Sequence, residues 1–450
     1  MVTVPRLVVA GTRSGSGKTT VATGLMAALR GLGLRVSGHK VGPDFIDPGY
    51  HALASGRPPR NLDAFMHGPE LIAPLFAHGA AGADVAVIEG VMGLFDGRAG
   101  TDEASTAHIA RLLDAPVVLV VDAASQSRSV AAEVHGFASF DPSIRIAGVV
   151  LNKVASDRHE AMLREALAPL GIPVVGVLRR SERVATPSRH LGLVPAAERR
   201  TEALELVDTL GRKLKEGIDL EAVMRLARSA PALDADPWRP PFGLADATRP
   251  VVAVAGGPAF TFVYTEHREL LEAAGADVAD FDPLHDEALP EGTVAAYLGG
   301  GFPEAYASEL AANTGLADDL RALSASGGPI VAECGGLLYL CRSLDSEKMV
   351  GLVPADAEFT DHLTLGYRAA RAASSGPLGP EDFEVRGHEF HRTVVRPRAG
   401  SRPAWDLGDH GLEGFNSGGV HASYLHTAWA AAPEMARFLL SYAHRKEELA

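Results

Sequence analysis

One stretch of the sequence places a lysine and threonines among glycines in the way that phosphate-binding turns do. It is "AGTRSGSGKTT" at residues 10–20, between an apolar run and a helical pattern. Glycines let the backbone approach phosphate, a helix N-terminus offers unpaired N–H groups, and Lys18 and Thr19 can supply a charge and a Mg²⁺ ligand. We therefore predict a variant phosphate loop, in which Gly11 stands one place earlier than the strict spacing requires.

Acidic side chains and a further lysine follow two later strands of the same half. The segment "GHKVGPDFIDPGYH" carries Lys40, Asp44 and Asp47, and "VIEGVMGLFDG" carries Glu89 and Asp96. The carboxyl ends of parallel strands meet at one edge of a sheet, so we expect these side chains near the phosphate loop. Carboxylates there could hold Mg²⁺ or orient a substrate carboxylate, and Lys40 could neutralise a transferred phosphoryl group. Alternatively, Asp44 and Asp47 only form turns beside their neighbouring prolines.

The end of a later strand offers one more candidate for nucleotide binding. Asn152 and Lys153 close the apolar run "IRIAGVVLN" and are similar to a pair that reads a purine base. Termination of the strand is an equally simple account of Asn152 taken alone. We treat Asn152 as a nucleotide-binding candidate.

A cysteine on a tight turn is the second reactive feature. The stretch "PIVAECGGLLYL" indicates strand, sharp turn and helix, so we expect Cys334 at a helix N-terminus, where the pKa of a thiol is lowered. A thiolate also needs a base, and "GGVHASYLHTAW" supplies His426, with His421 as a second candidate. The glycines at 299–301 could donate N–H groups to an oxyanion. These residues predict acyl transfer through a thioester. The alternative is that Cys334, like Cys341, is a small buried hydrophobe.

Periodicity divides the chain into two α/β halves. Up to about residue 215, short β-branched runs alternate with amphipathic helical patterns, which indicates a doubly wound parallel sheet covered on both faces. Residues 231–249 are rich in Pro, Ala and Asp and have neither hydrophobic period, so we expect a linker there. A second alternating series follows. The predicted domains are 1–230, with the phosphate loop, and 250–450, with the cysteine turn.

Composition limits the partners of the chain. The 450 residues carry a formal charge of −14, which disfavours nonspecific binding of nucleic acid and of anionic membranes because the field repels phosphate. No segment approaches about 18 uninterrupted apolar residues, so we expect no membrane insertion, and we find no export signal. Two cysteines are too few for a disulfide framework. These features favour the reducing cytoplasm.

A series of segments, in order along nearly the whole chain, resembles the glutamine-dependent a,c-diamide synthases that amidate cobyrinic or hydrogenobyrinic acid in cobalamin biosynthesis. They include "KVGPDFIDPGYH", "EGVMGLFDG", "AFTFVYTEHRELLE", "ECGGLLYL", "RGHEFH" and "ASYLH". The N-terminal half is similar to ATPases of the dethiobiotin synthetase type, and the C-terminal half to class I glutamine amidotransferases. The resemblance implies ATP and Mg²⁺ as cofactors, a tetrapyrrole polycarboxylate and L-glutamine as ligands, and amidation through an acyl phosphate. It is compatible with a homodimer.

The resemblance also implies roles for individual residues. Cys334 would be the nucleophile on glutamine and His426 its base. Mg²⁺ would lie near Thr19 and Glu89. The residues that would bind ATP are Gly15, Gly17, Lys18, Thr19 and Thr20. Those that would serve the substrate carboxylate and its phosphorylated intermediate are Asp44, Asp47 and Asp96. Many amidotransferases have glutamate two residues after the histidine, where this chain has Ala428, so we expect a Cys–His dyad.

Other activities fit parts of the sequence. A nickel-sirohydrochlorin a,c-diamide synthase would share the architecture. A regulatory P-loop ATPase with a non-catalytic amidotransferase-like domain would leave the cysteine turn unused, and such ATPases commonly carry a lysine early in the loop, near the position of Arg13. A substrate with several carboxylates requires a basic pocket, for which Arg189 and His190 are candidates, although both could instead stabilise a loop.

Overall fold

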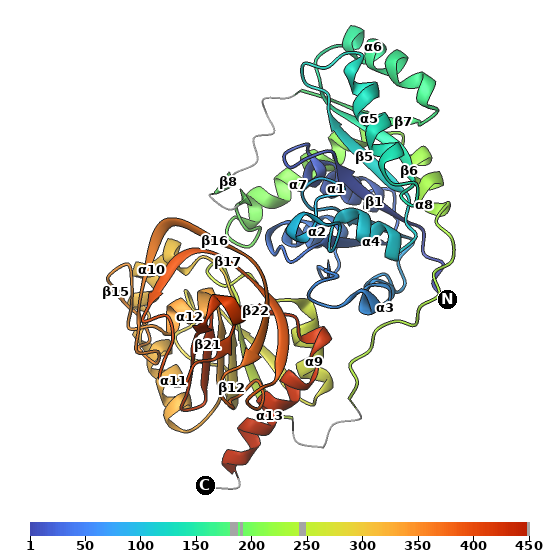
Figure 1. Cartoon of the computed structure of the whole chain (residues 1–450). Helices are drawn as coiled ribbons and strands as arrows, with labels where there is room; N and C mark the ends of the chain where they lie inside the picture. Colours follow the sequence, from blue (N-terminus) through green and yellow to red (C-terminus); the bar gives the residue numbers. More distant parts are fainter. Residues whose placement is uncertain (181–187, 190–191, 243–248, 448–450) are drawn as a thin grey trace. The chain divides into compact units, whose positions relative to one another are not determined.

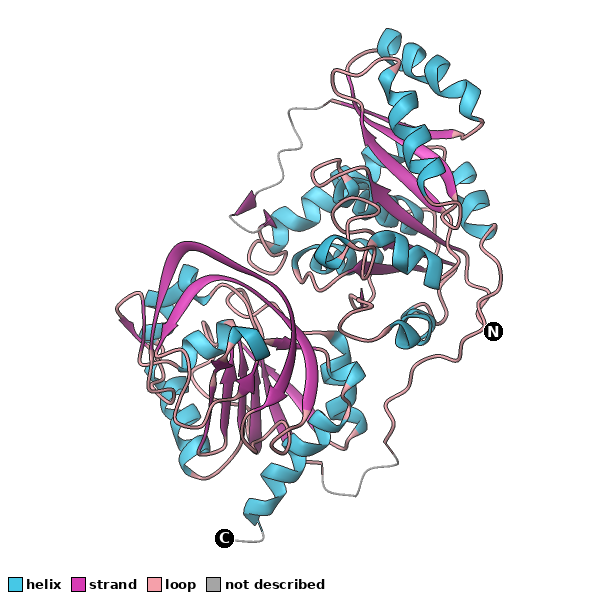
Figure 2. Cartoon of the chain, in the orientation of Figure 1, coloured by secondary structure: helices cyan, strands magenta, loops and turns pink. Residues whose placement is uncertain are grey.

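The computed structural model describes residues 1–180, 188–189, 192–242 and 249–447. The chain forms two compact units, Met1–Arg239 and Pro240–Ala450 (Figure 1). Each unit is built around a mostly parallel sheet with helices beside it (Figure 2). The predicted fold class, two α/β domains, is confirmed. The candidate His190 lies outside the described residues, and Arg189 lies in the two-residue strand β8 (Ser188–Arg189), which pairs with β9 (Gly192–Leu193).

A seven-stranded parallel sheet forms the core of the first unit. Its strands, in spatial order, are β3 (Asn61–Leu62), β2 (Val36–Val41), β4 (Val85–Glu89), β1 (Arg6–Gly11), β5 (Val117–Asp122), β6 (Ile146–Val154) and β7 (Val174–Arg179). Most of these residues are fully buried, because β-branched and small apolar side chains pack against helices on both faces. The alternation in the sequence predicts these strands except β3, which is too short to show a period.

Helices cover both faces of this sheet because later strands are added on both sides of β1. Right-handed crossovers in the two directions place the connecting helices on opposite faces. On one face, α1 (Lys18–Arg30), α2 (Ile46–Ser55) and α7 (Arg200–Gly217) contact one another. Further helices are α3 (Pro69–Gly79), α4 (Thr106–Leu112), α5 (Ser129–Phe140), α6 (Asp157–Leu167) and α8 (Leu220–Arg228). Folds of this kind bind ligands at the carboxyl ends of the central strands, here β1 and its neighbours.

Residues 231–238, which the composition assigns to a linker, pack onto the first unit. Leu233 pairs with Val2 through two backbone hydrogen bonds. Trp238 is buried, and its backbone N–H donates to the carbonyl oxygen of Pro74 at 2.9 Å. The expected linker therefore begins later than the composition indicates, because a stretch without a hydrophobic period can still be held by backbone hydrogen bonds.

The second unit contains a six-stranded sheet that is parallel except at one edge. Its strands, in spatial order, are β11 (Asp277–Phe281), β10 (Val251–Ala255), β12 (Thr293–Leu298), β13 (Ile330–Glu333), β21 (Val420–Ser423) and β20 (Phe415–Ser417). The helices of this unit are α9 (Thr265–Ala273), α10 (Ala307–Ala312), α11 (Thr314–Ala325), α12 (Gly335–Leu340) and α13 (Glu434–Glu447). The pairing of β13 with β21 joins the cysteine turn to the C-terminal part of the chain.

A long antiparallel ribbon, which the sequence analysis does not predict, forms a second sheet in this unit. Strand β16 (Asp356–Ala372) pairs with β17 (Glu384–Arg396), and the two arch together in Figure 1. Short strands extend the ribbon: β14 (Ser343–Leu344), β15 (Glu347–Lys348), β18 (Trp405–Asp406), β19 (Leu412–Glu413) and β22 (His426–Thr427). Much of β16 is exposed, so it lacks the apolar runs that reveal the other strands.

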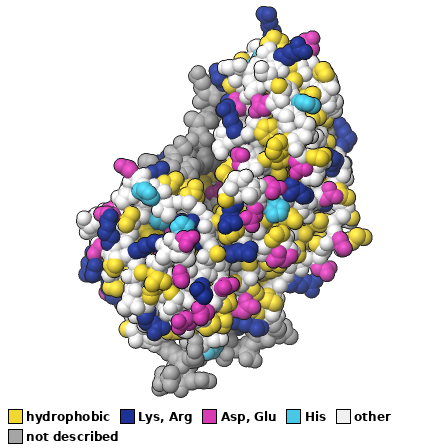
Figure 3. All heavy atoms as spheres, in the orientation of Figure 1, with side chains coloured by type: hydrophobic (Ala, Val, Ile, Leu, Met, Phe, Trp, Pro, Cys, Tyr) yellow, Lys and Arg dark blue, Asp and Glu magenta, His cyan; other side chains and the backbone are white. Residues whose placement is uncertain are grey.

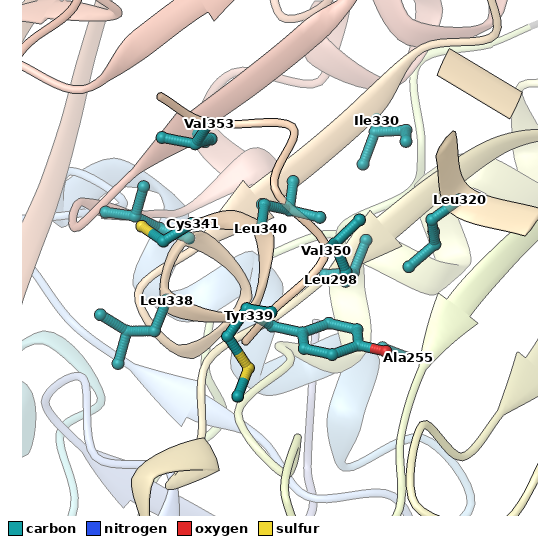
Figure 4. Close-up of a cluster of buried hydrophobic side chains, with 14 of the residues drawn as sticks. Ala255, Leu298, Leu320, Ile330, Leu338, Tyr339, Leu340, Cys341, Val350 and Val353 are labelled. Atoms are coloured by element: carbon teal, nitrogen blue, oxygen red, sulfur yellow. The ribbon is translucent and has the colours of Figure 1, made fainter. Parts of the chain in front are cut away.

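An apolar cluster packs around α12 in the second unit (Figure 4). Leu298 of β12 and Ile330 of β13 lie to the right in the close-up. Leu338 of α12 and Cys341, which directly follows α12, lie to the left. Cys341 is fully buried within the cluster. Its surroundings agree with the prediction that this cysteine acts as a small hydrophobe.

The surface of the chain mixes charges of both signs. On the face drawn in Figure 3, acidic and basic side chains lie among one another over both units, and no large area has a single sign. Within the described ranges, no helix combines the length and the apolar character that a bilayer crossing requires. Anionic ligands on this face would therefore be bound by local groups rather than by a broad surface field.

Two helix glycines provide a matched test of the packing between α1 and α7. A Cβ at Gly24 would lie 2.6 Å from Cδ2 of Leu214 and 3.0 Å from the carbonyl oxygen of Leu210, whereas a Cβ at Gly136 would meet nothing within 4 Å. We expect Gly24→Ala to lower the free energy of unfolding by about 1–3 kcal/mol through overpacking. Gly136→Ala should raise it by about 0.5–1 kcal/mol, because alanine favours a helix. Urea unfolding measures both, and two equally stable variants would contradict the packing.

Candidate active sites

The loop between β1 and α1 has the backbone geometry of a phosphate cradle. Gly15 and Gly17 have φ angles of 75° and 102°, which glycine adopts without steric cost. A Cβ at Gly17 would lie 2.2 Å from Nδ2 of Asn152, so the close approach of β6 requires glycine there. The same Nδ2 donates to the carbonyl oxygen of Ser16 at 2.9 Å. Asn152 therefore supports the loop, and its role toward a purine stays a prediction.

A cavity of about 300 Å³ opens over this loop, within the first unit. The predicted nucleotide-binding residues all line it: Gly15, Gly17, Lys18, Thr19, Thr20 and Asn152. Tyr50 of α2 and Leu206 and Leu210 of α7 also line the cavity, and the sequence motifs assign no role to these three residues. The hydroxyl of Tyr50 donates to the carbonyl oxygen of Val194 at 2.8 Å. The cavity thus combines a polar glycine loop with apolar side chains from two helices.

Lys18 is folded over its own loop. Its Nζ donates to the carbonyl oxygens of Met92, at 2.5 Å, and Arg13, at 3.2 Å. Burial, followed by the nearby charge of Lys40, lowers the pKa of Lys18 to about 8. The ammonium therefore keeps its proton at neutral pH and can pair with an anion in the cavity.

A buried cluster of charges lies at the carboxyl ends of β2 and β4. The ammonium of Lys40 donates to Asp47 (2.6 Å), to Glu89 (2.9 Å) and to the carbonyl oxygen of Gly90 (3.2 Å), which occupies its three N–H groups. Burial alone would lower the pKa of Lys40, but Asp47 and Glu89 outweigh it and raise the pKa above its usual value. Lys40 stays charged and joins the two carboxylates, and its predicted contact with a phosphoryl group stays a prediction.

Glu89 connects this cluster to α1 and α2. Its Oε1 accepts from the hydroxyl of Thr19 at 2.6 Å, and its Oε2 lies 2.6 Å from Nε2 of His51. Burial raises the pKa of Glu89, but Lys40 and then His51 and Thr19 outweigh it, so the pKa lies well below its usual value. Burial and the charge of Glu89 instead raise the pKa of Asp47. Asp47 is therefore the member of the pair that takes up a proton more readily.

Oxygen donors suitable for Mg²⁺ meet at Thr19. Its hydroxyl lies 2.6 Å from Glu89 and 3.3 Å from Asp47, and Mg²⁺ prefers hydroxyl and carboxylate oxygens. In the part of the chain that the structure describes, no group of three or more His, Cys, Asp or Glu side chains could hold a metal. Mg²⁺ commonly completes its shell with water and phosphate oxygens. The donor set therefore fits an ion that arrives with a nucleotide.

Asp44 and Asp96 accept hydrogen bonds within their own turns. Asp44 accepts from the N–H groups of Ile46 (3.1 Å) and Asp47 (3.2 Å) and so caps the first turn of α2. Asp96 accepts from the N–H of Gly93 at 2.9 Å. These bonds agree with the turn-forming interpretation of Asp44. Both carboxylates keep further lone pairs, and their role toward a substrate stays a prediction.

Cys334 occupies the sharp turn between β13 and α12. Its φ of 49° and ψ of −102° are strained for a residue with a Cβ. A Cβ at Gly335 would lie 2.9 Å from the amide nitrogen of Gly301, and one at Gly336 would lie 2.3 Å from the carbonyl oxygen of Leu298. The two glycines therefore let the turn approach β12. Backbone strain of this kind is common at functional residues.

The thiol lacks the lowered pKa that the sequence pattern predicts. Helix α12 has only six residues, and Cys334 is 4% exposed. Burial, followed by the nearby charge of Glu304, raises the pKa of the thiol well above its usual value and outweighs the hydrogen bond from the N–H of Gly335. Cys334 is therefore protonated at neutral pH, and a role as nucleophile would require a base that removes the proton.

Strand pairing brings His426 to this turn. Strand β21 runs parallel to β13 with Glu333 opposite Ser423, and the N–H of Cys334 donates to the carbonyl oxygen of Ser423 at 2.7 Å. His426 follows shortly after and faces the glycine turn, since a Cβ at Gly300 would lie 2.4 Å from its Cε1. Burial, and then the neighbouring histidines, lower the pKa of His426 well below its usual value. The imidazole is therefore neutral and can accept a proton.

The second candidate base, His421, has different surroundings. It packs edge-on against Trp405, with ring centroids 5.1 Å apart, and burial lowers its pKa to about 3. His426 instead stacks on His388 of β17, with centroids 4.9 Å apart. His388 belongs to "RGHEFH", whose role the motif alone does not reveal, and it lies opposite His426 in the strand register. The geometry favours His426 as the base.

The glycine turn offers fewer oxyanion donors than its three glycines suggest. The N–H of Gly300 donates to the carbonyl oxygen of Phe262 at 3.1 Å, so it is already used. The amide nitrogen of Gly301 lies against Gly335, and the N–H of Gly335 faces the sulfur of Cys334. Gly301 and Gly335 are therefore the better candidates for donors to an oxyanion.

Comparison with known proteins decides the family. Residues 7–194 match the CobQ/CobB/MinD/ParA nucleotide binding domain, and residues 251–434 match the CobB/CobQ-like glutamine amidotransferase domain. The chain is 58% identical to a hydrogenobyrinate a,c-diamide synthase of Streptomyces coelicolor over 96% of each chain. It is 54% identical to that of Thermobifida fusca over 96% of this chain and 95% of the relative. A cobyrinate a,c-diamide synthase of Synechococcus is 41% identical over 95% and 96%. The chain belongs to the a,c-diamide synthase family.

Membership of the a,c-diamide synthase family confirms the resemblance and the enzyme class predicted from the motifs. The relatives that match nearly the whole chain are named synthases, which favours a synthase over a regulatory P-loop ATPase with a non-catalytic amidotransferase-like domain. Several residues near the sites have no motif-based prediction, among them Tyr50, His51 and Glu333. Tyr50 and His51 do end the diagnostic segment "KVGPDFIDPGYH", and Glu333 directly precedes the cysteine. For Tyr50, His51 and Glu333, closeness in sequence to predicted site residues is the only indication that they lie near a site.

In this member of the a,c-diamide synthase family, a buried carboxyl holds the turn that leads to His426. Glu413 of β19 accepts from the hydroxyl of Ser423 at 2.6 Å and from the N–H of Tyr424 at 2.8 Å. Burial raises the pKa of Glu413 from its ordinary 4.5 to about 7. The folded chain therefore binds this proton more tightly than the unfolded chain does.

We expect the wild type to lose stability relative to Glu413→Gln as the pH rises from about 5 to 8. The contribution of the Glu413 proton is complete below the unfolded pKa of 4.5 and is lost as the pH rises to about 7. The pKa difference limits the effect to about 3 kcal/mol. Urea unfolding of both proteins at the two pH values measures it. The same pH dependence in both would contradict the raised pKa.

Proposed function

We propose that this chain is a hydrogenobyrinate a,c-diamide synthase, which amidates the a and c carboxylates of the metal-free corrin with ammonia from glutamine. The observation that carries the proposal is 58% identity across 96% of both chains to a relative of that name. Relatives at 51% and 54% identity also carry the hydrogenobyrinate name, whereas relatives at 41% and 42% carry the cobyrinate name. We infer a cytoplasmic location, in keeping with the two free cysteines.

The first unit makes the carboxylate reactive. A carboxylate does not accept ammonia at neutral pH because its leaving group is poor, and ATP bound with Mg²⁺ supplies the phosphoryl group that forms an acyl phosphate. The N–H groups of the glycine loop bind the phosphates, and Lys18 turns from the carbonyls of Met92 and Arg13 toward them. Thr19, with Glu89 and Asp47, supplies oxygen donors for Mg²⁺. Lys40 keeps those carboxylates together.

The second unit releases ammonia from glutamine. His426 takes the proton from the thiol of Cys334, and the sulfur attacks the amide carbon. The N–H groups of Gly301 and Gly335 stabilise the oxyanion. His426 then gives its proton to the departing ammonia, which leaves a thioester that water hydrolyses to glutamate. Ammonia in water at neutral pH is mostly protonated and not nucleophilic, so the reaction requires its release within the enzyme and its attack on the acyl phosphate.

Replacing the nucleophile should separate the two nitrogen donors. We expect Cys334→Ser to lower ammonia release from glutamine by about 10³-fold or more, because a serine at this position lacks the nucleophilic sulfur. Diamide synthesis with added ammonium should persist. Cys341→Ser is the matched control, since Cys341 lies in the apolar cluster, and it should keep glutaminase activity. Unchanged ammonia release by the Cys334→Ser protein would contradict the assignment.

Removing the loop lysine should abolish synthesis with either donor. We expect Lys18→Ala to lower diamide formation by about 100-fold or more with glutamine and with ammonium alike, because both routes need the phosphorylated carboxylate. Mass spectrometry of the tetrapyrrole after incubation with ATP measures the product, with hydrogenobyrinate and cobyrinate tested in parallel. Synthesis by this variant at the wild-type rate would contradict the acyl phosphate route, and a preference of the wild type for cobyrinate would contradict the substrate.

A further inference from the structure

Four buried residues form a closed ring of hydrogen bonds beside the cysteine turn, which includes one backbone carbonyl. The hydroxyl of Thr427 donates to Oε1 of Glu333 at 2.6 Å, and the hydroxyl of Tyr297 lies 2.8 Å from Oε2. His267 closes the ring, with Nδ1 3.1 Å from the hydroxyl of Tyr297 and Nε2 3.0 Å from the carbonyl oxygen of Thr427. Each of the four residues is at most 2% exposed. We call this group the Glu333 ring.

Two members of the Glu333 ring are chain neighbours of the reacting pair. Glu333 directly precedes Cys334, and Thr427 directly follows His426. The carboxyl of Glu333 accepts from the backbone N–H of Thr427 at 3.2 Å as well as from its hydroxyl. One side chain therefore fixes the backbone next to the nucleophile to the backbone next to the base. A shift in the ring would change the distance between sulfur and imidazole.

Ala428 stands where many amidotransferases have a glutamate that completes the triad, and its methyl group cannot accept a hydrogen bond from His426. The orientation of His426 also depends on the position of its backbone, which Glu333 holds through Thr427. We propose that the Glu333 ring positions His426 against Cys334, because Glu333 joins the backbone beside the cysteine to the backbone beside the histidine. This inference rests on the proposed glutaminase reaction. Glu333, Tyr297 and His267 are then positioning residues and do not touch glutamine.

The hydrogen bonds of the ring can be satisfied with one titratable proton, which is bound either by His267 or by Glu333. If Glu333 is ionised, Tyr297 donates to it and His267 donates from both nitrogens as a cation. If Glu333 is protonated, it donates to Tyr297, which donates to a neutral His267. Burial raises the pKa of Glu333 to about 7, which is consistent with either placement near neutral pH. Both placements leave the ring without net charge, which lowers the free energy cost of burying it.

Aromatic packing holds the ring in shape. Trp429 stacks on His267 with centroids 4.5 Å apart and an angle of 17° between the rings, and its indole N–H donates to the hydroxyl of Thr427 at 3.0 Å. The backbone N–H of Trp429 makes a longer contact, 3.3 Å, with Nε2 of His267. Tyr297 meets His267 edge-on at 82°. His267 comes from the motif "AFTFVYTEHRELLE", so the ring also accounts for a segment to which the proposed reaction assigns no role.

A pair of tyrosine variants tests the ring. Tyr297→Phe removes one hydroxyl from the ring and keeps the aromatic volume. We expect the kcat of glutamine hydrolysis to fall by about 10- to 100-fold while KM stays within about twofold, because a misplaced base slows the reaction but not binding. Tyr339→Phe is the matched control, since Tyr339 is fully buried in the same unit (Figure 4) and its hydroxyl has no hydrogen-bond partner among the described residues. It should keep the wild-type kcat.

A second readout does not depend on glutaminase activity. Peptide mass spectrometry measures the rate at which iodoacetamide alkylates Cys334 at each pH. This rate depends on the thiolate fraction, and so on the interaction of the imidazole with the thiol. Tyr297→Phe should shift this pH profile, and Tyr339→Phe should not. Glu333→Gln should keep kcat within about threefold, because an amide can accept from Thr427 and donate to Tyr297.

Different results would overturn the positioning role of the Glu333 ring and the proposed glutaminase reaction. A Tyr297→Phe protein with the kcat and the alkylation profile of the wild type would overturn the role of the ring, as would a Glu333→Gln protein as impaired as Tyr297→Phe. A wild-type protein that releases no ammonia from glutamine would overturn the proposed glutaminase reaction. In that case the alkylation profiles of the two phenylalanine variants still decide whether the ring positions His426.

Discussion

Both units depend on the fact that parallel strands bring their carboxyl ends to one edge of a sheet. In the first unit this constraint gathers the glycine loop after β1 and Glu89 at the end of β4, although many residues separate them in the sequence. In the second unit the pairing of β13 with β21 does the same for the turn at Cys334 and the segment that leads to His426. Backbone hydrogen bonds between strands therefore bring the parts of each candidate site together.

The two candidate sites differ in the charge of their buried groups. In the first unit, the buried ammonium of Lys40 keeps Glu89 ionised, so that acidic oxygens and a phosphate-binding loop can stand side by side. In the second unit, burial leaves both the thiol of Cys334 and the imidazole of His426 uncharged at neutral pH. A neutral pair costs less to bury than an ion pair, and the proton moves only when the substrate reacts. The candidate site in the first unit therefore contains buried charged groups, whereas the thiol and imidazole of the candidate site in the second unit are neutral.

Local sequence patterns predict most helices and strands and the two turns of the candidate sites. They do not predict the contacts between residues that are distant in sequence. The glycine loop and the cysteine turn are predictable because strand, turn and helix are adjacent in sequence. The position of the glycine loop next to Tyr50 and the contact of Glu333 with Thr427 arise from tertiary packing, which one sequence does not reveal. The exposed ribbon of β16 and β17 lacks an apolar period. The lowered pKa predicted for Cys334 is wrong in direction, because the sequence does not reveal how completely the thiol is buried.

The central claim is that one unit activates a carboxylate by phosphorylation while the other supplies the nitrogen that replaces the phosphate. Hydrogenobyrinate labelled with oxygen-18 in its carboxylates tests this claim most directly, in the presence of ATP and glutamine. If ammonia displaces phosphate from an acyl phosphate, one labelled oxygen leaves with each phosphate, and mass spectrometry finds the label in inorganic phosphate as the diamide forms. Formation of the diamide with no label in the phosphate would contradict the account.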